Sequence, residues 1–221
     1  MKVLIACEYS GIIREAFKAL GHYAVSCDLL PTEIPGLHYQ GDIFDIIDSE
    51  DFDLLVGCPP CTFLTYAGTC NWLDEGRTLQ RIEAAKFFMR LYESKIKHVC
   101  IENPRGIMTQ LFRKPDMEIH PYYFGDNEMK RTCLWLKNLP PLLYQLEPDM
   151  FTSEYTGTKK PEPLQIQIRK KTGKIKKRYR CDATNLDTFK NGHERSRFFP
   201  SIAKAMAVQW TEYINNQNTN I

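Results

Sequence analysis

The sequence contains no long hydrophobic run. Its apolar stretches break off after a few residues, well short of the roughly 20 consecutive apolar residues that a membrane-spanning helix needs. The first residues, Met1 to Glu8, form one such short run and do not have the length of an export signal. We therefore expect no membrane partner and a cytoplasmic location, where cysteines stay reduced.

Spacings that would bind a metal ion are also scarce. The chain has eight cysteines and five histidines, but only Cys58 and Cys61 show CxxC spacing, and no HxxxH is present. Because a zinc site needs a second pair of ligands, we expect no metal. A redox dithiol at the same pair is a further alternative, although no amphipathic helix follows Cys61 directly. Most other cysteines lie in apolar, strand-like runs and suit core packing: Cys7, Cys27, Cys100 and Cys133.

Acidic residues are nearly absent from one segment. From Lys159 to Arg180 there are ten Lys and Arg residues and one acid, Glu162, which gives this segment a charge of +9. The whole chain has a charge of +2, so the remainder carries −7. A basic segment on a mildly acidic body predicts a polyanionic partner, with solvated surface charge as the simpler alternative.

The same basic segment has the pattern of a β-hairpin. Apolar and polar residues alternate from Leu164 to Ile168, which is typical of a strand with two different faces. Thr172 and Gly173 allow a turn, and Lys174 to Tyr179 can return as the second strand.

Elsewhere, apolar strands alternate with amphipathic helices. The expected strands are 3–7, 23–28, 52–56, 99–101 and 131–136, and the expected helices are 11–20, 77–92 and 201–213. This alternation predicts an α/β fold with a parallel, doubly wound sheet. The 221-residue length and 43% hydrophobic composition suit one globular domain with a small appendage.

Polar residues stand directly after four of these strands. They are the segment Cys7 to Gly11, then Asp28, Cys61 and Glu102. Ligands of doubly wound sheets bind at the carboxyl ends of the strands, so we expect these residues to converge on one cleft.

The segment around Cys61 carries a resemblance to a known family. Residues 53–68, Asp-Leu-Leu-Val-Gly-Cys-Pro-Pro-Cys-Thr-Phe-Leu-Thr-Tyr-Ala-Gly, closely resemble the Pro-Cys catalytic loop of DNA cytosine C5 methyltransferases. Further matches follow in the family's order: Tyr9-Ser10-Gly11, Gly41-Asp42-Ile43, 101–106 with its Glu-Asn-Pro, 124–131, and 199–203. The resemblance covers about residues 1–142 and 195–213 and is strongest to small phage or prophage members.

This resemblance implies a Rossmann-like sheet of the S-adenosylmethionine-dependent methyltransferase type. Residues 1–142 plus 195–221 would form the catalytic domain, in the cytoplasm of a bacterium or of a phage-infected host. Residues 143–194 would form a small basic insertion in the place of the family's target-recognition region.

The resemblance also assigns catalytic roles. Cys61 would add as a thiolate to C6 of cytosine, which activates C5 to accept a methyl group. Glu102 would protonate or hydrogen-bond N3 and the exocyclic amine. Arg131, together with Lys130, would hold the base carbonyl. Arg105 and Arg131 are cations that could favour the thiolate.

S-adenosylmethionine and DNA are the implied cofactor and partner. The implied cofactor contacts are Tyr9, Ser10, Gly11, Asp28, Asp42 and Pro59. The implied substrate or DNA contacts are Pro60, Arg105, Lys130, Lys170, Lys171, Lys174, Lys176, Lys177 and Arg178. The target cytosine must be flipped from a duplex or lie in a single strand, and Thr62 to Trp72 is a candidate lid over it.

The sequence departs from the family at several points. Gly11 is followed by Ile12-Ile13-Arg14-Glu15 in place of further glycines, which weakens the expectation for the cofactor. Thr62 replaces a glutamine, Pro104 replaces a valine, and the Gln-x-Arg-x-Arg segment is reduced to Met129-Lys130-Arg131.

The short target region keeps two alternatives open. About fifty residues offer little surface for reading several base pairs. One alternative is a methyltransferase acting on a free cytosine nucleotide or a single strand. The other is a catalytically inactive methyltransferase-fold protein that binds DNA.

Overall fold

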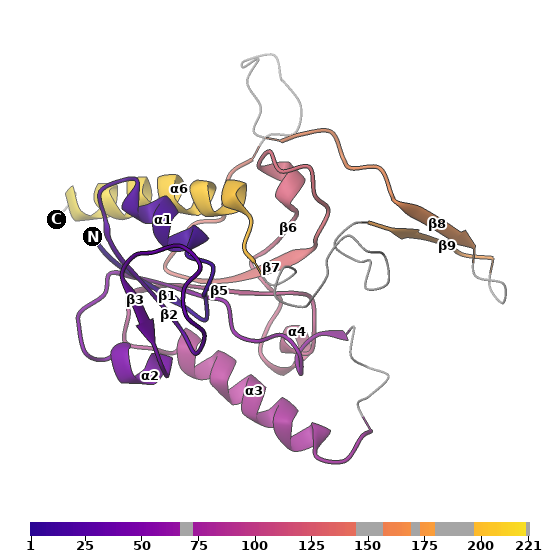
Figure 1. Cartoon of the computed structure of the whole chain (residues 1–221), viewed down its shortest axis with the longest axis horizontal. Coiled ribbons are helices and arrows are strands. Elements are labelled where there is room, and N and C mark those ends of the chain that lie inside the picture. The colour runs from indigo at the N-terminus through magenta and orange to yellow at the C-terminus, as the bar shows by residue number, and fades with distance from the viewer. Residues whose placement is uncertain (67–72, 145–156, 169–172, 180–196, 220–221) are drawn as a thin grey trace.

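The computed structural model describes residues 1–66, 73–144, 157–168, 173–179 and 197–219 (Figure 1). Its elements are β1 (Lys2–Ala6), α1 (Ile12–Lys18), β2 (Tyr23–Asp28), β3 (His38–Gln40), α2 (Ile43–Ile46), β4 (Leu54–Gly57), α3 (Arg77–Tyr92), β5 (His98–Asn103), α4 (Met108–Leu111), β6 (Met117–Ile119), the 3-10 helix η2 (Pro121–Tyr123), β7 (Thr132–Lys137), β8 (Gln165–Ile168), β9 (Ile175–Arg178) and α6 (Pro200–Thr219). Within the described part of the chain, no helix is long and apolar enough to span a membrane.

Seven strands form one sheet in the order β3-β2-β1-β4-β5-β7-β6. β1, β2, β3, β4 and β5 pair in parallel, as the alternation of strands and helices predicts. β7 pairs antiparallel with both β5 and β6, so the sheet is mixed, and the prediction of a parallel sheet was wrong at this edge. The burial of β7 is that of a central strand, which is why its residues did not reveal its direction.

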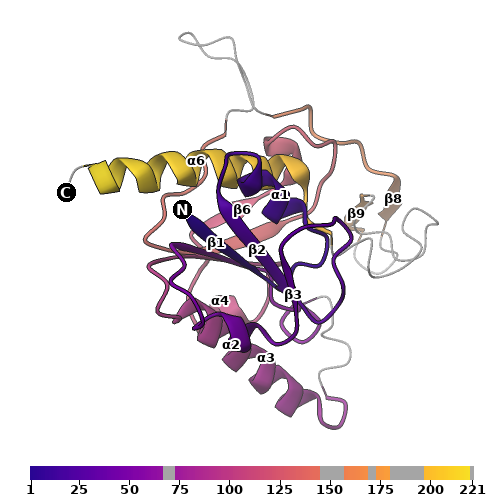
Figure 2. The same cartoon turned by 60° about the vertical axis from the view of Figure 1, so that its left-hand side comes forward.

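This sheet order with an antiparallel β7 is typical of the S-adenosylmethionine-dependent methyltransferase fold. Helices cover both faces, with α1 and α6 on one side and α2, α3 and α4 on the other (Figures 1 and 2). Each side has its own apolar core. Ile13, Phe17 and Trp210 are buried on the first side, and Phe88 and Trp135 on the second.

Two expected strand ends lie elsewhere in the structure. β1 ends at Ala6, and Cys7 turns the chain with a positive φ of 59°, a conformation that is uncommon for a residue with a side chain. β5 continues through Glu102 to Asn103, because both residues still pair with β7. Glu102 is therefore held by the sheet itself, not by a loop after it.

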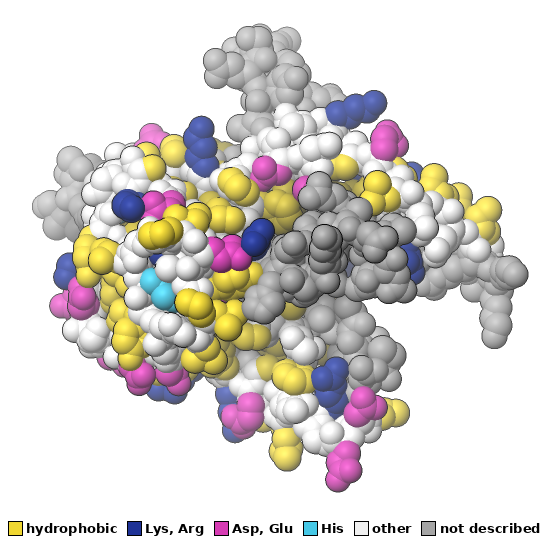
Figure 3. All heavy atoms as spheres, viewed as in Figure 1, with side chains coloured by type: hydrophobic (Ala, Val, Ile, Leu, Met, Phe, Trp, Pro, Cys, Tyr) yellow, Lys and Arg dark blue, Asp and Glu magenta, His cyan; other side chains and the backbone are white. Residues whose placement is uncertain are grey.

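The predicted hairpin is confirmed by β8 and β9, which pair with Ile166 opposite Lys177 and Ile168 opposite Ile175. It extends away from the body of the molecule (Figure 1). Ile166, Ile168 and Ile175 share one face and are all more than 60% exposed, and hydrophobic side chains along the ribbon are visible in Figure 3. The hairpin therefore has an uncovered apolar face as well as cations.

Candidate active site

The loop that carries Cys61 begins where β4 ends, at Gly57. The Cys58 amide donates to the Ala6 carbonyl of β1 at 2.9 Å, and the Asn103 amide nitrogen Nδ2 donates to the Pro59 carbonyl at 2.7 Å. The carbonyl of Cys61 then accepts the amides of residues 64 and 65 in a tight turn. Cys61 itself is partly exposed.

A second set of backbone contacts fastens this loop to the chain that leaves β5. The Ile107 amide donates to the Leu64 carbonyl at 2.8 Å, and Thr65 forms a β-bridge with Gly106. A Cβ atom at position 106 would lie 1.9 Å from the Leu64 carbonyl oxygen, so only glycine allows this approach. The expected convergence of the Cys61 and Glu102 segments is thus present in the backbone.

Glu102 is partly buried near the end of β5, opposite Leu134. Burial raises the pKa of Glu102, and the positive charge of Lys130 partly offsets this rise. Lys130 also lies over the Phe199 ring, with 5.5 Å between its Nζ and the ring centroid. Glu102 therefore keeps its proton to a higher pH than an exposed glutamate, as a proton donor requires.

Arg131 is placed differently from its neighbour Lys130. Its Nε lies 3.6 Å from the Glu118 carboxylate of β6, and its side chain is half exposed. Glu118 pairs with Cys133, whereas Glu102 pairs with Leu134, so the two acids belong to opposite faces of the sheet. Lys130, which the sequence made secondary to Arg131, is the cation whose charge acts on Glu102.

The two cysteines of the CxxC pair lie in unlike surroundings. Burial raises the pKa of Cys58 well above its usual range, and the carboxyl groups of Glu102 and Glu8 add to the effect. A thiol so situated stays protonated and is a poor nucleophile, redox centre or metal ligand. In the described part of the chain, the cysteines form no disulfide, and no cluster of three or more His, Cys, Asp or Glu residues could hold a metal ion.

The glycine turn after β1, Cys7 to Gly11, is arranged around Glu8, a residue to which the sequence assigned no role. Its Oε1 accepts the Ser10 hydroxyl and the Ile12 amide, the latter at 3.0 Å. Its Oε2 is buried and has no hydrogen-bond partner, and burial raises the pKa of this carboxyl. Gly11, at φ 78°, then begins α1 in a conformation that favours glycine. Glu8 could have been found from the sequence, because it lies just after the first strand.

Asp28 lies at the end of β2, and Asp42 lies directly before α2. The Asp28 carboxylate accepts the Leu30 amide at 3.0 Å, and its carbonyl accepts the Gly41 amide. Asp42 caps α2 by accepting the Phe44 amide, which is a structural role in its own right. Burial raises the pKa of Cys7 far above its usual value, and the carboxylates of Asp28 and Asp42 add to this rise. Both carboxylates therefore lie near the glycine turn that contains Cys7. Beside Asp28, Leu29 is 74% exposed.

The remaining sequence-predicted contacts are spread over the surface. Tyr9 and Pro59 are buried beside the two loops, while Pro60 and Arg105 are exposed. On the hairpin, Lys174 and Lys177 are exposed and Arg178 is partly exposed. Lys170 and Lys171 lie outside the described residues, as do 67–72 of the predicted lid, and only the backbone of Lys176 is described, in β9.

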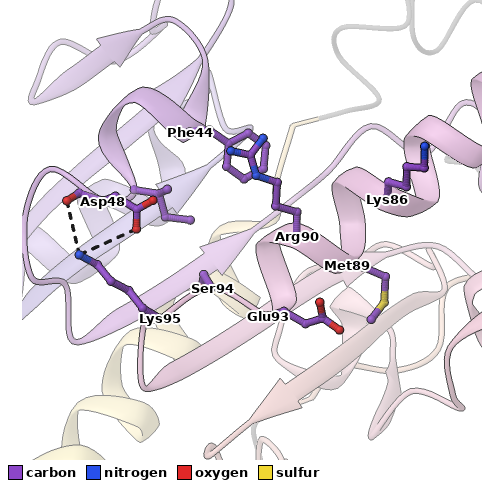
Figure 4. Close-up of a pocket in the computed structure, with 9 residues that line it drawn as sticks. Phe44, Asp48, Lys86, Met89, Arg90, Glu93, Ser94 and Lys95 are labelled. Atoms are coloured by element: carbon purple, nitrogen blue, oxygen red, sulfur yellow. Dashed lines mark hydrogen bonds and ion pairs between the residues drawn. The ribbon is translucent and has the colours of Figure 1, made fainter.

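A surface pocket of about 520 Å³ lies elsewhere, between α2 and α3 (Figure 4). The Arg90 guanidinium stacks on Phe44 with 3.4 Å to the ring centroid, and Lys95 pairs with Asp48 at 3.8 Å. These residues precede β4 and β5, so the pocket lies at the amino ends of the strands. It is therefore at the opposite end of the strands from the loops described above, and it contains none of their residues.

No family model matches the sequence, and no curated protein matches it. Among solved structures, the chain is similar to a prophage-encoded protein of E. coli described as a candidate DNA modification methyltransferase. That similarity has a TM-score of 0.43 at 15% sequence identity. It covers 62% of this chain and 46% of the other, so this chain spans less than half of that protein's length.

Proposed function

We propose that this protein transfers a methyl group from S-adenosylmethionine to C5 of cytosine in DNA, with Cys61 as the nucleophile. The observation that carries the proposal is the backbone attachment between the Cys61 loop and the end of β5. Through it, a partly exposed cysteine and a protonatable carboxyl, Glu102, come from adjacent strand ends. Lys130 supplies a cation to the same carboxyl.

The residues at the other strand ends fit S-adenosylmethionine. Asp28 and Asp42 offer carboxylates for hydroxyl and amine groups, and exposed Leu29 offers an apolar contact to a ring. The unpartnered Oε2 of Glu8 is an acceptor that suits a cationic group. When bound, S-adenosylmethionine supplies an electrophilic methyl group on a positively charged sulfur.

The residues of the chain activate the base in a defined order. The Cys61 sulfur forms a bond to C6 while Glu102 gives its proton to N3, so that C5 gains electron density. Lys130 stabilises negative charge on the base carbonyl. After methyl transfer a solvent base takes the C5 proton, the bond between sulfur and C6 breaks, Cys61 departs as a thiolate, and the N3 proton returns to Glu102.

The cations of the β8–β9 hairpin, Lys174, Lys177 and Arg178, are suited to phosphate contacts. Phosphate contacts release counterions, so we expect DNA binding to weaken steeply with salt. A flat salt response would contradict the role of the hairpin in DNA binding.

The test supplies tritiated S-adenosylmethionine with duplex DNA, single-stranded DNA and dCMP in parallel and locates the label. We expect label on C5 of cytosine in DNA with the wild type and with Cys58→Ser, and none with Cys61→Ser, although all three bind the cofactor. A wild type that binds S-adenosylmethionine and labels no cytosine would contradict the proposal.

One observation favours a second candidate, a methyltransferase of free cytosine nucleotides or single strands. Only about fifty residues, 143–194, separate the last two family-like segments, which is little surface for reading a duplex. Label on dCMP and none on duplex DNA would favour this candidate.

A further inference from the structure

Arg14 of α1 is completely buried, which is rare for an arginine. Its Nη1 donates to the hydroxyl oxygens of Ser26 and Thr32 at 2.9 and 3.2 Å, and its Nη2 donates to the Ile34 carbonyl. Its Nε pairs with the Glu15 carboxylate at 3.0 Å. One guanidinium therefore joins α1 to β2 and to the connection between β2 and β3.

Two glycines leave the space that this guanidinium occupies. A Cβ at Gly36 would lie 2.7 to 2.8 Å from three atoms of the guanidinium, and a Cβ at Gly11 would lie 2.8 Å from Nη2. Such distances are shorter than real Cβ atoms show. The glycine turn and the β2–β3 connection thus both close on the same buried charge.

The β2–β3 connection, residues 29–37, forms a wall beside the proposed cofactor residues. It starts directly after Asp28, and its Glu33 amide donates to the Tyr9 carbonyl of the glycine turn at 2.9 Å. The Glu33 carboxylate also pairs with Arg197 at 2.8 Å. In this way, Arg14 lies between the two segments that would enclose S-adenosylmethionine.

The chemistry of this site requires an arginine. A planar guanidinium presents donors in several fixed directions, whereas a lysine ammonium is a single compact charge that cannot reach the same spread acceptors. A buried charge also needs a partner, which the Glu15 carboxylate supplies. Arg14 lies in the stretch after Gly11 where the sequence departs from the family's glycines.

We propose that Arg14 is a positioning residue that fixes the glycine turn and the 29–37 connection as the two walls of the cofactor site. This inference rests on the proposed function, because it takes S-adenosylmethionine as the ligand. Arg14 acts through Gly11, Thr32 and Ile34 and does not itself touch the reaction.

The experiment compares Arg14→Lys and Thr32→Val with Lys18→Gln as the matched control. Lys18 lies on the same helix and pairs with the same Glu15, at 3.1 Å, but reaches no residue of the connection. We would measure the dissociation constant for S-adenosylmethionine and the hydrogen exchange of the 29–37 peptide by mass spectrometry. We would also measure methyl transfer to DNA at varied S-adenosylmethionine concentrations, which gives kcat and the KM for the cofactor separately.

We expect at least tenfold weaker cofactor binding and faster exchange in Arg14→Lys, a severalfold smaller effect in Thr32→Val with kcat retained, and no change in Lys18→Gln. Thr32→Val decides the question if Arg14→Lys does not fold. Unchanged cofactor affinity and unchanged hydrogen exchange in the folded variants would overturn the role of Arg14 and leave the proposed function standing. A wild type that binds no S-adenosylmethionine would overturn the proposed function.

Discussion

The loop after β4 and the turn after β1 both lie at the carboxyl ends of the parallel strands but are held in place by different means. The Cys61 loop is fixed by hydrogen bonds to main-chain carbonyls and by one glycine contact, through Asn103 and Gly106. The glycine turn is fixed by two buried ionisable side chains, Glu8 and Arg14. Main-chain contacts do not titrate, whereas the Glu8 carboxyl does, and both buried side chains depend on their neighbouring partners, so the two regions should respond differently to pH and to substitution.

The largest effect is expected from Gly106→Ala, which breaks the attachment of the Cys61 loop. The added Cβ would overlap the Leu64 carbonyl, so the loop must shift, with a loss of about 1–3 kcal/mol in unfolding free energy and of methyl transfer. Gly76→Ala is the control, because nothing lies within 4 Å of its Cβ and only its positive φ is strained. Thermal unfolding and DNA labelling measure both variants, and a fully active Gly106→Ala would contradict the assignment.

Glu102→Gln is expected to reduce kcat by roughly 10²- to 10⁴-fold, the usual contribution of a general acid. The raised pKa of Glu102 means that the wild type loses the active protonated form as pH rises through a value above the ordinary 4.3 or so of a glutamate. The pH profile of the wild type should show this decline, and the profile of the variant should lack it. Identical profile shapes would remove the acid role.

Lys130→Met against Arg131→Met tests which cation serves the base. We expect a loss on the order of 10²-fold in kcat for Lys130→Met, as for removal of one electrostatic donor. Arg131→Met should have a clearly smaller effect, because Arg131 pairs with Glu118. The reverse ranking in the labelling assay would restore the role that the sequence suggested for Arg131.

The smallest effect concerns Glu8→Gln. The folded-state pKa of Glu8 is raised, so an unfolded chain releases this proton first as pH rises, and the folded state loses stability between the two pKa values. Glutamine avoids this loss, so the variant should melt a few degrees higher than the wild type at pH 8 and show a smaller difference at pH 5. Its affinity for S-adenosylmethionine should fall. Lower stability at pH 8 would contradict this account.

Local patterns predicted much of this architecture. Helix 77–92 agrees with α3 residue for residue, and the alternation of residues 164–168 marked the first strand of the hairpin. The last helix was predicted to end at Tyr213 but continues to Thr219, where the sequence is polar and gives no periodic signal.

Long-range contacts were beyond those patterns. A buried strand reads the same in both directions, so the reversal of β7 was missed. The choice between Lys130 and Arg131 depends on which acid each one meets, and Glu102 and Glu118 are separated only by the pairing of β7 with β5 and β6. Arg14 counted against cofactor binding until its contacts with residues 32 and 34 were visible.

The most direct test of Cys61 uses DNA in which the target cytosine carries fluorine at C5. Fluorine replaces the proton whose loss would let Cys61 leave, so the covalent adduct should persist. We predict a complex between protein and DNA that survives denaturing electrophoresis, requires S-adenosylmethionine, maps to Cys61, forms with Cys58→Ser and fails to form with Cys61→Ser. A complex that forms with Cys61→Ser, or none with a wild type that binds both DNA and cofactor, would contradict the role of Cys61.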